Sequence, residues 1–108
     1  MFIFRIIMRV RSEKQKEVLQ TLLSMIDLPI KDSGCLSYDI FNDISDNNMF
    51  NLISEWETRH QLDRYLRSDK MSILLGTKSL LSEPLTVQII AVGDTEGVEA
   101  VYAVRKRN

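Results

Sequence analysis

The sequence has little of the chemistry that builds metal or redox sites, because its 108 residues include one cysteine, Cys35, and one histidine, His60. A single cysteine excludes an internal disulfide, and it also excludes an iron–sulfur or cysteine-rich zinc site that needs several thiolates. We therefore expect Cys35 to be a buried, inert thiol in a reducing compartment. A metal would have to be held by carboxylates, and no acidic cluster has suitable spacing. We expect no metal and no other cofactor.

The sequence also has no large excess of charge of one sign and no long apolar run. The formal net charge is −1, which gives no electrostatic attraction to nucleic acid or to an anionic membrane. No apolar run approaches the ~20 residues that cross a bilayer, and Arg5 and Arg9 interrupt the apolar segment 2–10, unlike the core of a signal peptide. We expect a cytoplasmic protein with no nucleic acid and no membrane as partner. Serine nucleophile elbows, phosphate-binding glycine loops and nucleic-acid aromatic motifs are missing from the sequence.

The composition that is present is that of a globular domain, with 44% hydrophobic and 27% charged residues. A chain of this length forms one core without disulfides or a structural metal. We expect one domain over residues 1–93 and a C-terminal extension over 94–108. Within the extension, valine and tyrosine at 98–104 favour an edge strand, and Arg105, Lys106 and Arg107 follow as a basic tail.

Alternating apolar residues predict four β-strands, at 2–10, 35–42, 49–57 and 85–92. In the second of these, alternation places Leu36, Tyr38 and Ile40 on one face and Cys35 on the other. Aspartate and asparagine dominate residues 43–48, which favours a tight turn, so the second and third strands are expected to form a hairpin.

Capping residues and helical spacing predict the helices. Ser12 begins a capping box, and a helix of about four turns then follows and ends before Pro29. Thr58 and Ser68 are expected to cap two further helices. Gly76 lies inside the second of these and costs roughly 1 kcal/mol relative to alanine. A glycine there predicts close packing or a bend.

The order strand, helix, strand, strand, helix, strand (βαββαβ) predicts a ferredoxin-like α+β sandwich with helices on one face of a mainly antiparallel, four-stranded sheet. The apolar residues of the other face exceed what a soluble monomer normally exposes. We therefore expect a twofold homodimer in which two sheets face each other.

Several short motifs carry a resemblance to a known family. They are Gly34-Cys35-Leu36-Ser37-Tyr38, the acidic hairpin at 43–48, Glu55-Trp56-Glu57, the junction at 66–71 and Leu81-Ser82-Glu83-Pro84. Their order and spacing resemble the antibiotic biosynthesis monooxygenase (ABM) domain over roughly residues 2–92. The resemblance implies a dimeric α+β barrel. It also implies that some relatives oxidise phenolic polycycles or quinols with O₂ and without a bound metal or flavin, while others degrade haem or rearrange small signalling molecules.

Two functions follow from the resemblance. The first is a cofactor-independent monooxygenase that acts on a small, largely apolar aromatic molecule such as a phenol, a quinol or an anthrone. The second is a non-catalytic dimeric module of the same fold that binds a small ligand or another protein. Relatives that oxidise anthrones carry an asparagine at the position of Leu52, and its absence favours the second function.

The candidate catalytic residues are Trp56, Tyr65 and His60. Trp56 matches a tryptophan that lines the substrate cavity in several oxygenating relatives, and a core anchor is the equal alternative because Trp56 shares a strand face with apolar residues. Many relatives carry a histidine nine residues after this tryptophan, where Tyr65 stands here. Tyrosine is a poor base near pH 7, and the position of Tyr65 on an apolar stripe favours a packing role.

His60 lies near a helix N-terminus, which favours a neutral imidazole that can act as a base, but its helical position favours contact with solvent. The haem-binding histidine of some relatives is matched near Leu75, which cannot bind iron. Arg5, Arg9 and Asp39 are expected to pair at the surface or in an interface. The expected substrate pocket consists of Leu52, Trp56, Leu62, Tyr65 and Leu74.

Overall fold

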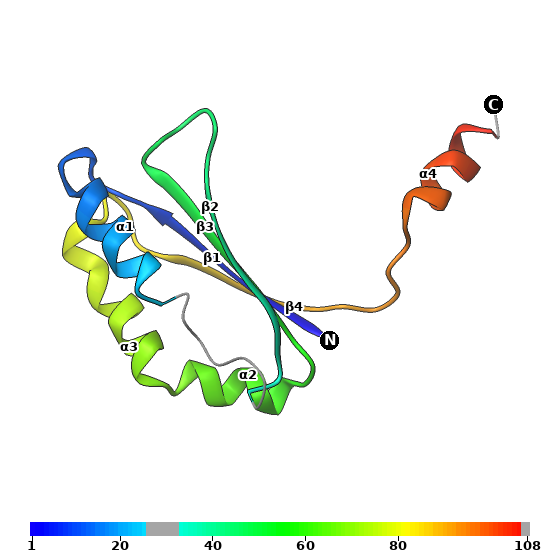
Figure 1. Ribbon diagram of the computed structural model, residues 1–108, viewed down its shortest axis with the longest axis horizontal. Coiled ribbons are helices and arrows are strands. Elements are labelled where there is room, and N and C mark those ends of the chain that lie inside the picture. Colours follow the sequence, from blue (N-terminus) through cyan, green and yellow to red (C-terminus); the bar gives the residue numbers. More distant parts are fainter. Residues whose placement is uncertain (26–32, 107–108) are drawn as a thin grey trace.

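A computed structural model describes residues 1–25 and 33–106 of the chain. They form a four-stranded antiparallel sheet of order β2-β3-β1-β4. The strands are β1 (Phe2–Arg9), β2 (Cys35–Asn42), β3 (Met49–Trp56) and β4 (Thr86–Ala91). Helices α1 (Gln15–Leu23), α2 (Arg59–Leu66) and α3 (Asp69–Leu75) all lie on one side of this sheet (Figure 1). The predicted ferredoxin-like α+β fold is confirmed.

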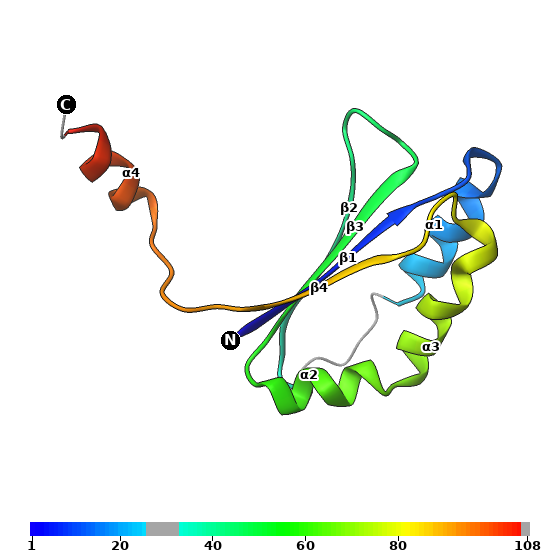
Figure 2. The same cartoon turned by 180° about the vertical axis from the view of Figure 1, so that it is seen from behind.

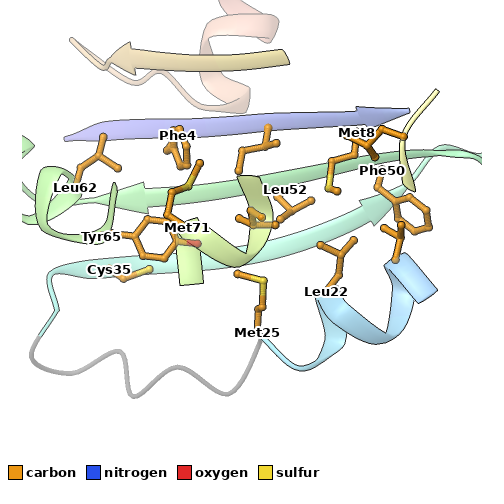
Figure 3. Close-up of a cluster of buried hydrophobic side chains, with 14 of the residues drawn as sticks. Phe4, Met8, Leu22, Met25, Cys35, Phe50, Leu52, Leu62, Tyr65 and Met71 are labelled. Atoms are coloured by element: carbon orange, nitrogen blue, oxygen red, sulfur yellow. The ribbon is translucent and has the colours of Figure 1, made fainter. Parts of the chain in front are cut away.

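The hydrophobic core lies between the sheet and the helices (Figure 3). Alternate side chains of β1 and β3 point into it, so the period of two read from the sequence is confirmed for both strands. The largest fully buried side chains are Trp56, Phe4, Ile6, Met8, Leu22, Met25, Leu62, Leu74 and Val18.

The first helix differs from its prediction. A 3₁₀ turn, η1 (Ser12–Lys14), precedes α1, which has 9 residues and is shorter than about four turns. The predicted end before Pro29 lies outside the described residues. Ser12 does not cap the helix, because its hydroxyl oxygen accepts a hydrogen bond from Asn48 Nδ2 at 2.9 Å. Gln15 Nε2 likewise donates to the carbonyl oxygen of Asn47 at 2.7 Å. Ser12 and Gln15, which have the three-residue spacing of a capping box, therefore both bind the β2–β3 turn instead.

The second strand contains a β-bulge that the sequence did not predict. Cys35 pairs with Trp56 and Ser37 pairs with Glu55, so Leu36 is the extra residue between them. Because the bulge reverses the alternation at this point, Cys35 faces the core and is 5% exposed, whereas Leu36 is 51% exposed. The prediction that Leu36 shares a face with Tyr38, opposite Cys35, is therefore wrong.

The turn between β2 and β3 forms as predicted. Asp43 Oδ2 accepts hydrogen bonds from the backbone nitrogen of Ser45 at 3.0 Å and from its hydroxyl at 2.6 Å. Asp46 Oδ1 accepts from the backbone nitrogen of Asn48 at 3.0 Å. These side chains satisfy main-chain groups that a tight turn leaves without a backbone partner.

The second part of the helical layer changes type at Gly76. Helix α3 ends at Leu75, and the chain continues as the 3₁₀ helix η2 (Gly76–Leu80). Gly76 has φ −75° and ψ −5°, and no atom lies within 4 Å of the place where a Cβ would stand. The predicted close packing at Gly76 is therefore absent, and the change from α to 3₁₀ geometry occurs there instead.

Gly76→Ala is expected to raise the free energy of unfolding by about 0.4–1 kcal/mol, because alanine fits the native backbone and restricts the unfolded chain. Urea denaturation followed by far-UV circular dichroism measures the change. Gly34→Ala is the matched control, because Gly34 has φ +75° and an added Cβ would meet the Gln61 side chain. Gly34→Ala should destabilise the fold, and a loss of stability in Gly76→Ala would contradict the open space seen at that position.

The C-terminal segment is a helix, α4 (Val98–Arg105), and the predicted edge strand at 98–104 is wrong. Glu99 lies in its first turn and Arg105 in its last, where each charge suits the helix dipole. The chain from Val92 to Gly97 carries α4 away from the sheet and from the other helices (Figures 1 and 2). Arg107 of the basic tail lies outside the described residues. No helix within 1–25 and 33–106 is both long enough and apolar enough to span a membrane.

Candidate functional site

The end of β3 and the start of α2 form a corner that is fixed by short-range hydrogen bonds. The backbone nitrogen of Glu57 donates to the carbonyl oxygen of Gly34 at 3.0 Å, which ties this corner to the start of β2. Thr58 Oγ1 accepts from the backbone nitrogen of Gln61 at 3.2 Å and caps α2. Ser68 Oγ accepts from the backbone nitrogen of Met71 at 3.4 Å and caps α3. Both predicted caps are confirmed.

Trp56 lies at this corner and is 1% exposed. Its indole Nε1 donates to Ser54 Oγ at 2.9 Å, and Ser54 Oγ in turn donates to the carbonyl oxygen of Phe4 at 3.4 Å. The indole ring lies 5.0 Å from the ring of Tyr65, measured between centroids. Because the indole N–H already has a buried partner, Trp56 can offer a ligand only its ring.

Tyr65 and Tyr38 form a hydroxyl pair between α2 and β2. Their oxygens are 3.1 Å apart, and their rings meet edge to face with centroids 6.1 Å apart. Burial raises the pKa of Tyr65 far above its ordinary value, and its hydrogen bond with Tyr38 raises it further. Burial also raises the pKa of Tyr38. Both phenols are therefore neutral near pH 7, where they can donate a hydrogen bond and cannot act as bases.

A hollow of about 180 Å³ opens beside these aromatic rings. Its lining residues are Ser33, Trp56, Gln61, Arg64, Tyr65 and Ser68. Trp56 and Tyr65 supply the apolar part of the wall, and the helix α2 supplies Gln61 and Arg64. Arg64 is exposed, and its side chain forms no hydrogen bond or ion pair with any residue in the described part of the chain. Its guanidinium is therefore available to an anionic group that enters the hollow.

The structure brings together two of the predicted site residues, Trp56 and Tyr65. Leu52, Leu62 and Leu74 are 2%, 0% and 0% exposed, belong to the core cluster and do not line the hollow. His60 is exposed on α2 and does not line the hollow either. The roles predicted for these residues in binding and catalysis remain predictions.

Sequence reasoning missed the polar rim of the hollow. Gln61 and Arg64 lie three residues apart on one side of α2, and Ser68, the cap of α3, follows four residues after Arg64. That spacing is visible in the sequence, whereas His60 stands out only as the single histidine. Tyr38 was assigned to a strand face, and only the fold shows that its hydroxyl meets Tyr65.

Two further hollows lie elsewhere. One of about 520 Å³ lies where η2 leads into β4 and is lined by Leu75, Lys78, Leu81, Ser82, Glu83, Pro84 and Leu85. The other, of about 410 Å³, lies on the sheet face without helices and includes Arg5, Phe41, Met49, Asn51 and Ile53. Neither contains an aromatic pair like that of Trp56 and Tyr65.

The remaining candidates are structural. The Cys35 thiol donates to the carbonyl oxygen of Ser37 at 3.3 Å, and burial raises its pKa, as expected of an inert thiol. Arg5 donates to Asn51 Oδ1 at 3.2 Å, and Arg9 pairs with Glu83 at 3.3 Å on the surface. Over residues 1–25 and 33–106, no three histidine, cysteine or acidic side chains gather closely enough to hold a metal ion.

The raised pKa values of Tyr38 and Tyr65 predict a loss of stability in alkali. In the unfolded chain both phenols ionise near pH 10, whereas in the folded chain they remain neutral to higher pH. Their contribution is fully present below about pH 10 and is lost as the pH rises above it, at up to about 1.4 kcal/mol per pH unit for each phenol that ionises only on unfolding.

Thermal unfolding measured between pH 8 and pH 12 tests this expectation. Tyr65→Phe removes the more strongly shifted phenol, so the variant should lose stability less steeply above pH 10 than the parent chain. Equal slopes for the two proteins would show that Tyr65 ionises without unfolding.

Comparisons with known proteins agree with this fold. The chain is 22% identical over 89 residues to an uncharacterized protein of Synechocystis sp., a match that covers 82% of the chain and 60% of that protein's length. The fold matches a crystal structure of an antibiotic biosynthesis monooxygenase with a TM-score of 0.76 and 22% identity, over 87% of this chain and 100% of the other.

Two further solved structures share the fold. A Deinococcus radiodurans protein matches with a TM-score of 0.80 and 18% identity, over 90% of this chain and 97% of the other. Rv0793 of Mycobacterium tuberculosis matches with a TM-score of 0.77 and 21% identity, over 89% of this chain and 98% of the other. The profile of the antibiotic biosynthesis monooxygenase family matches residues 1–72, which include β1, β2, β3 and α2. The chain therefore belongs to the antibiotic biosynthesis monooxygenase family.

Proposed function

We propose that this protein is a cofactor-independent monooxygenase that acts on a small phenol or quinol held in the hollow beside Trp56 and Tyr65. The observation that carries the proposal is the combination of two aromatic rings with Arg64, a cation that has no other partner among the described residues. The rings suit the flat face of an aromatic substrate, and the guanidinium suits its phenolate oxygen.

The size of the hollow favours a substrate with one ring. Its volume of about 180 Å³ is below the ~300–1,000 Å³ typical of pockets for drug-sized ligands. A single phenol or hydroquinone ring suits such a space better than the three fused rings of an anthrone. One-ring substrates are therefore the first to test.

The chemistry needs little from the protein beyond binding and charge. Arg64 would lower the pKa of the bound phenol and favour its phenolate, whose electron-rich ring can transfer an electron to O₂. For a phenol with a free para position, one oxygen atom of O₂ enters the ring, the other leaves as water, and the ring becomes a quinone. That balance requires no external reductant. The neutral hydroxyl of Tyr65 would donate a hydrogen bond, and enclosure beside Trp56 would limit competing water.

The rival function is a non-catalytic module that binds the same kind of molecule. It is favoured by one observation: among residues 1–25 and 33–106, none that lines the hollow is a base near pH 7, because Tyr65 is held neutral and the others are Ser, Gln, Arg and Trp. An oxygenase would then depend on the substrate reaching the hollow already ionised or losing its proton to water.

We also propose that residues 1–93 form the family domain, that 94–108 are an extension, and that the protein works in the cytoplasm as a homodimer. The sheet face without helices carries apolar side chains, including Phe41 and Ile90 at 51% and 42% exposure. Pairing two such faces would bury them in a twofold dimer. Analytical ultracentrifugation should give twice the chain mass of 12.5 kDa at micromolar concentration, and a single 12.5 kDa species would contradict the dimer.

Oxygen uptake with a panel of phenols, hydroquinones and anthrones tests the function. We expect uptake with at least one one-ring compound, and we expect Arg64→Gln to raise its KM by at least about tenfold, the equivalent of 1.4 kcal/mol. Arg59→Gln is the matched control, because Arg59 lies on the same helix and pairs with Asp63 at 2.8 Å instead of lining the hollow. Tight binding detected by Trp56 fluorescence, without oxygen uptake for any compound, would establish the rival function.

A further inference from the structure

Helix α4 has an apolar side that nothing in the described structure covers. Val98, Val101 and Tyr102 share one side of the helix and are 56%, 54% and 62% exposed. The helix has 8 residues and buries none of them. Isolated helices shorter than about 12–15 residues are only marginally stable in water. Helix α4 therefore needs a surface to pack against.

The same chain has an uncovered apolar surface on the helix side of β4. Val87 pairs with Ile6 and Ile89 pairs with Phe4, so both face the same side as the core, yet they are 44% and 37% exposed. With Leu85 they form a row that we call the β4 strip. The strip leads into the hollow of about 520 Å³ next to Leu85, whose apolar lining also includes Leu75, Leu81 and Pro84.

Both surfaces carry charges of both signs. Arg105 and Lys106 lie at the end of α4, and the hollow is lined by Lys78 and by Glu83, whose side chain is 63% exposed and pairs with Arg9. Asp94, Glu96 and Glu99 precede or begin α4 and make its other end acidic. A helix with an acidic start is poorly suited to an anionic membrane surface. The charges thus favour a protein surface as the partner of α4.

We propose that α4 docks on the β4 strip of a second copy of this chain, whose own α4 docks on the first. In the single chain, α4 stands away from its own sheet (Figures 1 and 2). The connecting residues 92–97 can span about 20 Å when extended, which is enough to reach a neighbouring subunit. A reciprocal exchange about a twofold axis covers the apolar side of α4 and the β4 strip in both copies. This inference rests on the homodimer proposed above.

The exchange assigns the two hollows on the helix side of the sheet to different tasks. Val101 and Tyr102 of one copy would fill the hollow next to Leu85 in the other, while the hollow beside Trp56 remains open to the substrate. The larger of the two is then a subunit contact.

Cysteine cross-linking between differently tagged copies tests the exchange. One copy carries Val87→Cys and the other carries Tyr102→Cys, and the two are unfolded together and refolded as a mixture. The native Cys35 is 5% exposed and does not compete. Oxidation should give a disulfide-linked dimer that contains both tags, at least about tenfold more abundant than with Ala103→Cys, which lies on the opposite side of α4. A yield equal to the Ala103→Cys control would overturn the proposal.

Two further measurements complete the test. A single chain that carries both Val87→Cys and Tyr102→Cys should give a linked dimer, and a linked monomer would overturn the proposal because α4 would then fold back on its own strip. Val101→Glu should raise the dimer dissociation constant by at least about tenfold, while Ala103→Glu changes it less than about twofold. An unchanged constant in Val101→Glu, or binding of the parent chain to anionic vesicles through α4, would overturn it too.

The outcomes also separate this inference from the proposals on which it rests. If the exchange fails while the sheet faces still pair, Val101→Glu remains dimeric with unchanged affinity. If the homodimer itself is wrong, the parent chain sediments as a monomer. Oxygen uptake depends on the hollow beside Trp56, so it reports on the proposed oxygenase function independently of α4.

Discussion

Replacing Trp56 with alanine is expected to lower the free energy of unfolding by about 3–5 kcal/mol. The indole is among the largest fully buried side chains, and its removal would leave a void between β3 and Tyr65. Ser54 would also lose the donor to its hydroxyl oxygen. Urea denaturation, with tertiary structure followed by near-UV circular dichroism of the tyrosines, measures the loss.

Trp56→Phe is the matched control. Phenylalanine keeps an aromatic ring in the core and removes the N–H donor, so its cost should be smaller than that of alanine. A loss below about 1 kcal/mol for Trp56→Ala would mean that the ring mainly lines an open cavity, because core truncations of aromatic residues cost more than that. The two variants together decide between the anchor and the pocket wall.

Leu62→Ala is expected to cost about 2–5 kcal/mol, because Leu62 is 0% exposed and packs in the core beneath α2. The same substitution should leave ligand affinity nearly unchanged, since Leu62 does not line the hollow. Chemical denaturation gives the first quantity, and ligand titration at a temperature where the variant is folded gives the second.

Leu75→Ala is the control for this prediction, because Leu75 is 48% exposed and lies outside the core cluster. Its effect on stability should stay near 0.5 kcal/mol. If Leu62→Ala instead weakens ligand binding strongly at little cost in stability, then the pocket predicted from the sequence is the right one and the hollow described here is not the site.

The fold could be predicted because short-range signals and long-range packing agree over most of the chain. Period-two alternation in β1 and β3 reflects burial of one strand face, and the caps Thr58 and Ser68 reflect unpaired amides at helix starts. Such local patterns do not depend on distant residues. The elements that they predict are therefore present in the folded structure.

Predictions failed where a distant partner or a competing pattern prevailed. Ser12 has the right spacing for a cap, yet its hydroxyl oxygen accepts a hydrogen bond from Asn48, which is far away in sequence. In α4, valines favoured a strand, but Val98, Val101 and Tyr102 have helical spacing and α4 pairs with no neighbouring strand. The β-bulge at Leu36 depends on the pairing of Cys35 with Trp56, which the sequence of β2 alone does not contain.

The candidate site was predicted in part, for a physical reason. The resemblance to the family singled out Trp56 and Tyr65, and the fold does place these two side by side. A pocket, however, is a volume that the surrounding side chains leave empty, whereas sequence patterns report only which residues are apolar. Leu52 and Leu74 are as apolar as a pocket wall requires, yet they are buried in the core cluster and do not line the hollow.

The β-bulge also has a meaning for how the family domain can vary over evolution. Leu36 is the extra residue of the bulge, where the register of β2 against β3 shifts, and its side chain is largely in solvent. A related protein that lacked Leu36 would keep every pairing from Ser37 to Asn42. Its β2 would then pair regularly with β3 up to Cys35, without the bulge. Elsewhere in the strand, the same deletion would turn the core side chains outward.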